Sequence, residues 1–445
     1  MSSAVEQALS DAGMREVEAQ SKARLFAAVA QQLKQSRDSE PLRWFVPGRI
    51  EVLGKHTDYA GGRSLLCTSE RGFCVSAIPR CDALLRITDV VRHSNFECKI
   101  SPDLEIPESG WTVYPSVVAR RLAQNFTGGL RGAEICLASD LPSAAGMSSS
   151  SALVVAIFTV LSEINRLSES REYQANLQTL LDLAAYLGCI ENGQTYRSLV
   201  GAGGVGTFGG SEDHTAILTS EPGHLKQYSF CPVRHERTIQ LPQECVFVIG
   251  VSGVVADKTG SAKARYNLAS LRVQEILRCW RTVTGTENVT LAAAASSSED
   301  APEKIGAAIR QVASTSADCD LLIRRFTQFC SESESIIPAA SDALVRGDLK
   351  GFGVLVDESQ QAAEDLLGNQ VRETVWLARA ARELGAHAAS AFGAGFGGSV
   401  WALVARDAVN QFMRRWQHEY ESILPPAHGA PQFFVTAAGP ALCRL

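Results

Sequence analysis

Strand-like and helix-like segments occur in mixed blocks along this chain, and this order constrains its fold more than any other feature. Four turn-bounded segments rich in Val, Ile and Cys predict strands between residues 45 and 139. From Ser148 the pattern becomes helical over ALVVAIFTVLSEINRL, and residues 173–191 favour a second helix. The second half opens with strand-like CVFVIGVSGVV and closes with FFVTAA. Because strands and helices do not alternate strictly, we expect an α+β fold with mixed sheets and flanking helices, and not a doubly wound sheet.

The length of 445 residues is too great for one ordinary hydrophobic core. We expect an N-terminal helical extension over residues 1–22, an N-terminal domain over 23–220 and a C-terminal domain over 221–445. Residues 6–35 favour one helix, since good helix formers carry apolar residues at mixed spacings of three and four. The low-complexity segment LAAAASSSEDAPEK, residues 291–304, predicts an exposed loop.

Composition narrows the function classes. The net charge is −6 and no basic stripe stands out, so nucleic acid is not an expected partner. The N-terminus lacks the basic end and apolar stretch of a signal peptide, and the apolar runs are too short to span a membrane. The twelve cysteines form neither a CxxC pair nor a Cys/His cluster with zinc spacing. We therefore predict a cytoplasmic protein with reduced thiols and no membrane partner.

A first polar segment, VPGRIEVLGKHTDYAGG, spans residues 46–62. Its Pro-Gly turn and short strand gather Arg49, Lys55, His56 and Asp58 around one turn. These residues alone are compatible with a hairpin end in which Asp58 caps the turn. They also suit a sugar pocket, because a carboxylate and an imidazole on a tight turn can hold sugar hydroxyls.

Two further segments are rich in small residues. LPSAAGMSSSSAL, residues 141–153, follows a strand and opens an apolar helix, so its backbone amides and the helix dipole could hold an anion. It has no GK[ST] and is not a Walker A loop, and a serine run at a helix start is equally compatible with a simple N-cap. SAFGAGFGGSV, residues 390–400, places four glycines within six residues, which indicates a close backbone approach.

Together the three segments resemble the GHMP kinase family. The first resembles the signature of its galactokinase branch, roughly PGR-(N)-LIGEHTDYN-G. The second is similar to the family's phosphate loop, P-x-x-x-G-(L)-S-S-S, and the third to G-A-G-F-G-G-(C), with Ser399 in place of Cys. The motifs stand in the family order, and the resemblance runs from about Leu42 to Val404. It implies a two-domain kinase with its active site in the cleft between the domains.

The resemblance also implies ATP and Mg²⁺ as cofactors. WTVY at 111–114 is similar to the family's W-x-x-Y, whose Trp lies beside the adenine. A hydroxyl of the serine run, Ser150, and the carboxylate of Glu191 are the implied metal ligands, which suits Mg²⁺ because it takes few protein ligands. The implied ATP-binding residues are Trp111, Gly146, Ser148, Ser149 and Ser150.

For the chemistry, GGSEDHTAIL at 209–218 resembles the galactokinase segment G-I-M-D-Q. Asp213 then stands at the position of the family's base, with His214 in place of Gln, and Glu212 is the nearest rival. Arg49 would keep Asp213 ionised and stabilise charge on the transferring group. The implied reaction is ATP-dependent phosphorylation of a monosaccharide at its C1 hydroxyl.

The sugar-binding residues implied by the resemblance are Lys55, His56, Asp58 and Tyr266, the last in a segment where Lys258 replaces a family Arg. Lys55 stands where galactokinases carry the Glu that binds the C6 hydroxyl. A cation there could pair with a C6 carboxylate, which predicts a uronic acid such as galacturonate as an alternative substrate. Otherwise Lys55 points away or donates to a neutral hydroxyl.

Two other functions stay open. A GHMP kinase could act on mevalonate or homoserine, although the HTDY segment argues against this. A catalytically silent sugar-binding regulator gains weight from Lys55, His214 and Gln360, which replaces a family His after Ser359. The intact pair of Arg49 and Asp213 argues against it. In each case the expected partner is a small molecule, and the chain is expected to be a monomer or a weak homo-oligomer.

Overall fold

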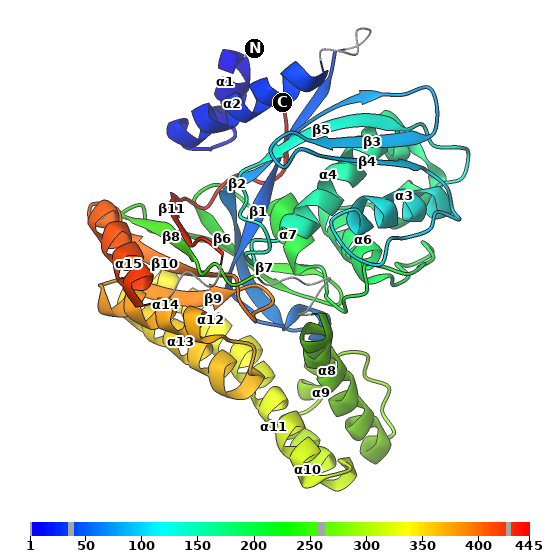
Figure 1. The fold of residues 1–445 in the computed structure, drawn as a ribbon. Coiled ribbons are helices and arrows are strands. Elements are labelled where there is room, and N and C mark those ends of the chain that lie inside the picture. Colours follow the sequence, from blue (N-terminus) through cyan, green and yellow to red (C-terminus); the bar gives the residue numbers. More distant parts are fainter. Residues whose placement is uncertain (1, 34–39, 256–262, 424–428) are drawn as a thin grey trace.

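The computed structural model describes residues 2–33, 40–255, 263–423 and 429–445. Within them, eight strands form one sheet in the order β12-β1-β2-β5-β3-β4, and β6 and β7 extend it from β2 (Figure 1). The parallel pairing of β3 with β5 makes this sheet mixed, as predicted. Its strands are β1 (Leu42–Leu53), β2 (Arg63–Pro79), β3 (Leu84–Asp89), β4 (Ser94–Lys99), β5 (Ala133–Ser139), β6 (His224–Ser229), β7 (Arg234–Gln240) and β12 (Cys443–Arg444).

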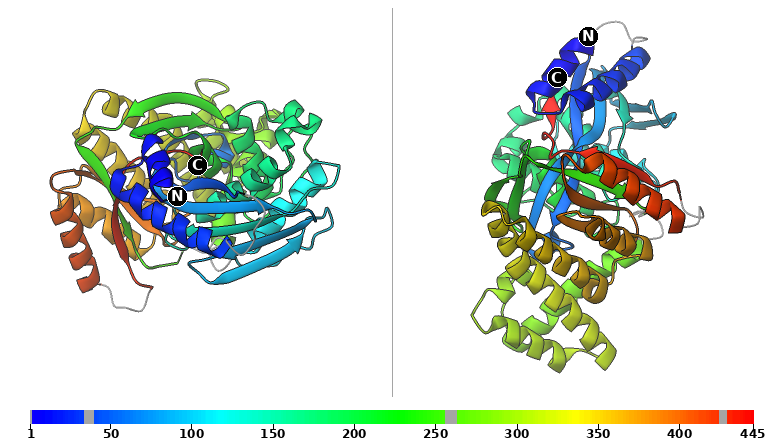
Figure 2. Two further views of the ribbon diagram at one scale, coloured as in Figure 1. Left: turned by 90° about the horizontal axis from the view of Figure 1, so that it is seen from above. Right: turned by 90° about the vertical axis from the view of Figure 1, so that its left-hand side faces the viewer.

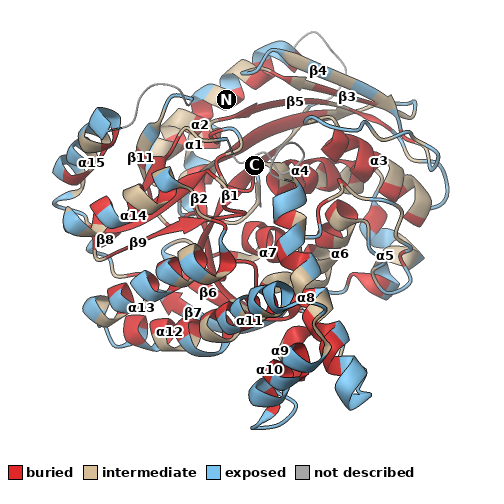
Figure 3. Ribbon diagram, turned by 60° about the horizontal axis from the view of Figure 1, so that its bottom comes forward, coloured by how far each residue is buried: buried red, intermediate tan, exposed pale blue. Residues whose placement is uncertain are grey.

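Both faces of this sheet are covered. Successive side chains of its long central strands point to opposite faces, and apolar residues stand on both of them. On one face, Trp44 of β1 belongs to the main core together with Leu153 of the following helix α4. On the other face, Phe45 and Cys74 pack against Leu9 near the N-terminus. Buried segments therefore run through the centre of the molecule in Figure 3. The helices of this half are α3 (Val113–Asn125), α4 (Ser149–Ile164), α5 (Arg171–Asn176), α6 (Leu180–Asn192) and α7 (Glu212–Thr219).

A second sheet of four antiparallel strands forms in the order β11-β8-β10-β9 within the described residues. Its centre contains Trp401, and Trp416 of α15 packs in the cluster on its outer side. The strands are β8 (Cys245–Val251), β9 (Ala388–Phe392), β10 (Ser399–Ala405) and β11 (Gln432–Thr436). The helices beside them are α12 (Ile337–Val345), α13 (Leu349–Ala362), α14 (Arg372–Glu383) and α15 (Val409–Ile423).

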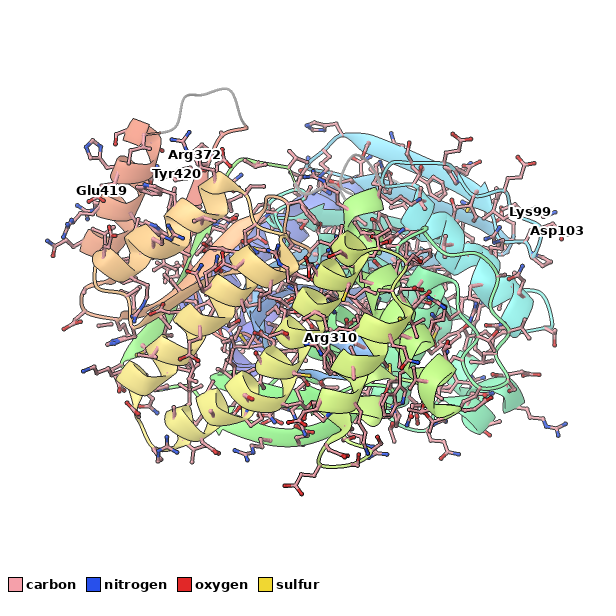
Figure 4. All side chains as sticks on the ribbon, turned by 90° about the horizontal axis from the view of Figure 1, so that it is seen from below. Lys99, Asp103, Arg310, Arg372, Glu419 and Tyr420 are labelled. Carbon is pink, nitrogen blue, oxygen red and sulfur yellow. The ribbon has the colours of Figure 1, made fainter. Side chains whose placement is uncertain are left out.

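Four helices, which follow β8 in the sequence and precede β9, form a unit that projects from one end of the molecule (Figures 1 and 2). They are α8 (Lys263–Thr284), α9 (Leu291–Ala295), α10 (Ala301–Val312) and α11 (Ser316–Cys330). Seen from below in Figure 4, Arg310 of α10 lies toward the viewer. The predicted loop over 291–304 is correct only for the exposed turn at residues 296–300, because its two ends belong to α9 and α10, with Leu291 and Ala294 buried in the core of this unit.

Two predicted helices are each divided in the structure. The N-terminal segment forms α1 (Ser2–Asp11) and α2 (Glu16–Leu33), separated at Gly13, whose φ of +92° a continuous helix cannot hold. The segment 173–191 forms α5 and α6, and Thr179 caps the second with a capping box. No helix in the described ranges is long and apolar enough to cross a membrane. The domain boundaries at 22 and 220 stay predictions, although the larger sheet extends to Gln240.

The three sequence segments converge between the sheets. The first runs along β1 into the turn after Leu53, and the second joins β5 to α4. The third joins β9 to β10, and its Ser399 hydroxyl donates a 2.6 Å hydrogen bond to the carbonyl of Ala145 in the second. Segments about 250 residues apart in sequence are thus joined directly at the site.

Candidate active site

Two pockets adjoin at Ala394, which lines both of them. The first pocket encloses about 510 Å³ and the second about 1070 Å³, including the parts open to solvent. The first is lined mainly by polar residues of β1, the following turn and α7. The second is lined by Trp111, Tyr114 and the start of α4. Both volumes suit small molecules.

The loop before α4 is shaped to approach an anion. Gly146 has a φ of +76°, and a Cβ there would lie 2.8 Å from the carbonyl oxygen of Phe392. Ser148 precedes the helix with a φ of +58°, and its buried hydroxyl has no hydrogen-bond partner among the described residues. Ser149 and Ser150 follow in the first turn and line the same pocket. Free amides at this helix N-terminus and an unpartnered hydroxyl therefore face the second pocket together.

Arg49 on β1 is the centre of the first pocket. Its Nε donates to Asp213 Oδ1 at 2.7 Å, and its Nη2 donates to the same oxygen. Asp213 lies in the first turn of α7, so a strand and a helix from distant parts of the sequence hold this pair. Burial alone would lower the pKa of Arg49, but Asp213, Glu212 and Glu51 outweigh it and raise that pKa. The guanidinium is thus permanently charged and fixed on Asp213.

A serine hydroxyl connects Asp213 to a second carboxylate. Ser151 Oγ lies 2.8 Å from Glu191 Oε2 and 3.1 Å from Asp213 Oδ2, as the hydrogen-bond donor to these oxygens. His214 Nε2 lies 3.2 Å from the same oxygen of Glu191. All of these side chains line the first pocket. They form a polar wall between the Arg49–Asp213 pair and the serine loop.

The turn after β1 is held by contacts on three sides. His56 has a φ of +59°, and its Nε2 lies 3.1 Å from the carbonyl oxygen of Ala394. Because that carbonyl can only accept, Nε2 carries the proton and Nδ1 accepts from the Tyr59 hydroxyl at 2.9 Å. Arg325 of α11, fully buried, donates to the carbonyl oxygen of His56 at 2.6 Å. The projecting helical unit therefore helps to shape this pocket.

Asp58 closes the same pocket from the other side. Its carboxylate accepts from the backbone N–H groups of Tyr59 at 2.8 Å and of Glu212 at 3.2 Å. The second bond fixes the turn to the start of α7. The ring of Tyr266 lies 5.2 Å from that of His56, and burial raises the pKa of its hydroxyl well above the ordinary value. A neutral phenol and a carboxylate thus line one pocket wall.

Family comparisons agree with this arrangement. The description "GHMP kinases N terminal domain" matches residues 113–195, and "GHMP kinases C terminal" matches residues 340–422. "Galactokinase galactose-binding signature" matches residues 33–79. The fold is similar to that of the Lactococcus lactis galactokinase crystallised with galactose, with a TM-score of 0.75 at 23% identity, covering 95% of this chain and 100% of that one. The chain has the two domains of a GHMP kinase.

Similarity extends along most of the chain. A galactokinase from Chloroflexus aggregans is 29% identical over 384 residues, covering 82% of this chain and 85% of the relative. One from Exiguobacterium sibiricum is 26% identical over 416 residues, covering 91% and 94%. The Methanococcus jannaschii mevalonate kinase has the same fold with a TM-score of only 0.52 at 11% identity, over 90% and 99%. The predicted family and the two-domain α+β GHMP kinase fold are therefore confirmed.

The residues present fit ATP and Mg²⁺. The predicted nucleotide-binding residues all line the second pocket, where the Ser148 hydroxyl has no hydrogen-bond partner among the described residues. They are Trp111, Gly146, Ser148, Ser149 and Ser150. The described residues contain no group of three or more His, Cys, Asp or Glu that could hold a metal. Glu191 with one serine hydroxyl would instead hold a Mg²⁺ that shares phosphate oxygens, as this hard cation prefers.

The structure brings most of the predicted site residues together. The first pocket is lined by both predicted catalytic residues and by three of the four predicted sugar residues, namely Arg49, Asp213, His56, Asp58 and Tyr266. Lys258 lies outside the described residues. The roles of all these residues stay predictions.

Lys55 does not reach the pocket, contrary to the expectation that it faces the sugar. Its ammonium is buried and donates to the hydroxyls of Ser359 at 3.1 Å and Ser390 at 2.8 Å. Ser390 in turn donates to Gln360 Oε1 at 3.0 Å. The left-handed conformation at His56 turns consecutive side chains in different directions, so that His56 enters the pocket and Lys55 leaves it. The geometry therefore gives no support to a contact between Lys55 and a C6 carboxylate.

Sequence reasoning missed two site residues. Ser151, and not the predicted Ser150, approaches Glu191. The four-serine run was a signal that any of its members could reach the metal site, but the helix phase within that run was unknown. Glu51 also lines the pocket, two residues after Arg49 on the same strand, so that alternation places both side chains on one face. That spacing could have identified Glu51.

Proposed function

We propose that this chain transfers a phosphoryl group from ATP to the C1 hydroxyl of a monosaccharide. The observation that carries the proposal is the Arg49–Asp213 pair, which lies where a sugar-sized pocket adjoins the serine loop. Phosphoryl transfer needs positive charge held beside the transferring phosphoryl group and a group that accepts the proton of the attacking hydroxyl. Both needs are served at this junction.

Asp213 is the proposed base. Arg49 donates twice to its Oδ1, whereas its Oδ2 accepts from the Ser151 hydroxyl, and the residue lines the first pocket. The rival carboxylate, Glu212, accepts from Ser64 at 2.7 Å, and burial followed by repulsion from Glu51 raises its pKa well above the ordinary value. A carboxyl that tends to keep its proton is a poor base, which favours Asp213.

When bound, ATP supplies the phosphoryl group, and Mg²⁺ neutralises charge on its phosphates. Free amides at the start of α4 and the Ser148 hydroxyl would hold the phosphates, and Ser151 with Glu191 would hold the metal. Arg49 would stabilise charge that develops on the transferring group. The arrangement thus assigns separate residues to nucleotide binding, charge stabilisation and proton transfer.

Galactose is the first candidate sugar, since the named relatives are galactokinases. His56, Asp58 and Tyr266 would bind its hydroxyls. A uronic acid is the weaker candidate, because the Lys55 ammonium is already bound by two serines. We further propose a cytoplasmic enzyme that acts as a monomer or weak homo-oligomer, which cell fractionation and sedimentation velocity would check.

The test is a coupled ADP-release assay over neutral hexoses, pentoses and hexuronic acids. Asp213→Asn should lower kcat by about 10²- to 10⁴-fold while ATP still binds, because proton transfer is lost. Asp357→Asn, at a half-exposed carboxylate on α13 that pairs with Arg382, is the matched control and should keep the wild-type rate. Full activity of Asp213→Asn would contradict its role as base. If no sugar is phosphorylated but sugars still bind, the regulator is favoured.

A further inference from the structure

Two carboxyl groups near Arg49 have no role in the mechanism above. Glu51 Oε2 lies 3.7 Å from Arg49 Nη2, and Glu212 Oε1 lies 3.4 Å from Arg49 Nε. Their side chains are almost fully buried, with residue exposures of 4% and 5%. In the galactokinase forms PGR-(N)-LIGEHTDYN-G and G-I-M-D-Q, the residue before L-I-G is Asn and the residue before the base is Met. Both positions are therefore uncharged in that pattern and acidic in this chain.

Neither glutamate has a complete set of hydrogen bonds. The Oε1 atoms of both glutamates are buried and have no hydrogen-bond partner among the described residues. Glu212 Oε2 accepts a hydrogen bond from the Ser64 hydroxyl at 2.7 Å. Both carboxyls lie within 3.7 Å of the Arg49 guanidinium in one pocket, and they can hydrogen-bond to each other, which is one of the causes acting on the pKa of Glu51. Two carboxylates cannot do so without a proton between them.

The surrounding charges cannot neutralise both groups. Arg49 is already paired with Asp213, and Asp58 adds a further negative charge near Glu212. Lys55 attracts Glu51 only from a distance, since its ammonium is bound by Ser359 and Ser390. Burial is the first cause that raises the pKa of each glutamate, and repulsion from neighbouring carboxylates adds to it. Two like charges side by side in a buried site leave one group protonated.

We propose that Glu51 and Glu212 hold one proton between them and that this singly charged pair keeps Arg49 directed at Asp213. The inference rests on the proposed function for its catalytic consequence only. Glu51 and Glu212 are positioning residues, because they act through the guanidinium. With one proton present, Arg49 faces one full charge on Asp213 and one shared charge on the pair.

Loss of this proton would change the competition for Arg49. As the pH rises through the raised pKa of the pair, its charge goes from −1 to −2, and the guanidinium is drawn away from Asp213. The proton-accepting carboxylate would then lose its fixed orientation. An alkaline decline of kcat that is set by the pair, and not by Asp213, is the expected consequence.

Infrared difference spectroscopy tests the shared proton without any need for turnover. At neutral pH ordinary carboxyl groups are ionised, so a protonated carboxyl band should be present in the wild type. The band should persist in Asp213→Asn and disappear in Glu51→Gln and in Glu212→Gln, whose amides keep the shape and can hydrogen-bond to the remaining carboxylate. Glu303→Gln, at an exposed position on α10, is the matched control and should keep the band. A wild type without the band, or Glu51→Gln and Glu212→Gln variants that retain it, would overturn the proposal.

The pH profile of kcat tests the positioning role. Glu51→Gln should move the alkaline decline upward by a pH unit or more, while Glu51→Ala should lower kcat about tenfold, because Glu212 is then left without its partner and competes for Arg49. A purely structural role would lower the Tm of both variants and leave the profile unchanged. If the infrared band behaves as expected but no sugar is phosphorylated, the acid pair stands and the proposed function fails.

Discussion

The proposed phosphate side of this site, around the second pocket, and the proposed sugar side, around the first pocket, differ in how they are built. On the phosphate side, backbone dominates: Gly146 and Ser148 hold left-handed conformations, and the third segment packs directly on the loop. On the sugar side, side chains dominate: Lys55, Ser359, Gln360 and Ser390 form one buried polar cluster behind the turn. Backbone geometry follows from a short motif, whereas a side-chain cluster needs partners from several elements.

The difference explains where this chain departs from the galactokinase pattern. Lys55 and Gln360 are separate replacements in the sequence, yet both contact the hydroxyl of Ser390. The two replacements therefore belong to one local hydrogen-bond network and are not two unrelated departures from the galactokinase pattern. Glu51 and Glu212 are likewise two departures that lie together, both within 3.7 Å of the Arg49 guanidinium. Departures that meet in space can leave the chemistry of the site intact.

Among the changes that test this comparison, the largest effect should come from the backbone of the phosphate side. Gly146→Ala adds a methyl group 2.8 Å from the Phe392 carbonyl oxygen at a φ of +76°, so the loop must move. We expect kcat/KM for ATP to fall about 100-fold, measured with saturating sugar. Gly285→Ala is the control, since Gly285 has a φ of +68° but no atom within 4 Å of the added Cβ. Equal losses in both variants would show that strain alone, and not the loop contact, causes the effect.

A smaller effect should distinguish two neighbouring serines. Ser151→Ala removes the hydroxyl 2.8 Å from Glu191, and we expect the Mg²⁺ concentration for half-maximal rate to rise about tenfold. Ser150→Ala should instead raise the KM for ATP, because Ser150 lines the nucleotide pocket. The measurement is a Mg²⁺ titration at fixed free ATP. A shift in Ser150→Ala alone would restore Ser150 as the metal ligand.

The serines also show what the sequence could not determine. The motif predicted correctly that a serine run opens a helix, and α4 begins at Ser149. Successive residues of a helix point about 100° apart, so a starting point uncertain by one residue changes which hydroxyl faces Glu191. Propensity defines helix ends only to within a few residues. Such a run therefore predicts the site but not the ligand.

Elsewhere, tertiary packing overrode local patterns. The alanine- and serine-rich segment after Thr290 has the composition of a loop, but Leu291 and Ile305 give it an apolar stripe that is buried against α8 and α11. The direction of Lys55 was equally beyond reach, because it depends on a left-handed His56 and on serines more than 300 residues away. The main strands were predictable, since they are turn-bounded runs rich in Val, Ile and Cys, as expected for strands buried on both faces.

The smallest effect should come from replacing Lys55. This variant tests most directly whether the buried cluster on the sugar side contacts the substrate. Lys55→Met removes two hydrogen bonds but also the cost of burying an ammonium, so the free energy of unfolding should change by only about 1 kcal/mol. The KM for galactose should change less than about threefold, since Lys55 is not in the pocket lining. Asp58→Asn in the same turn is the matched comparison and should raise this KM about tenfold or more, because Asp58 lines the pocket and fixes α7. A large rise in KM for Lys55→Met, or a loss of turnover specific to galacturonate, would place Lys55 on the substrate after all. In that case the sugar side would bind the negative charge of a C6 carboxylate, and a uronic acid would again be a candidate substrate.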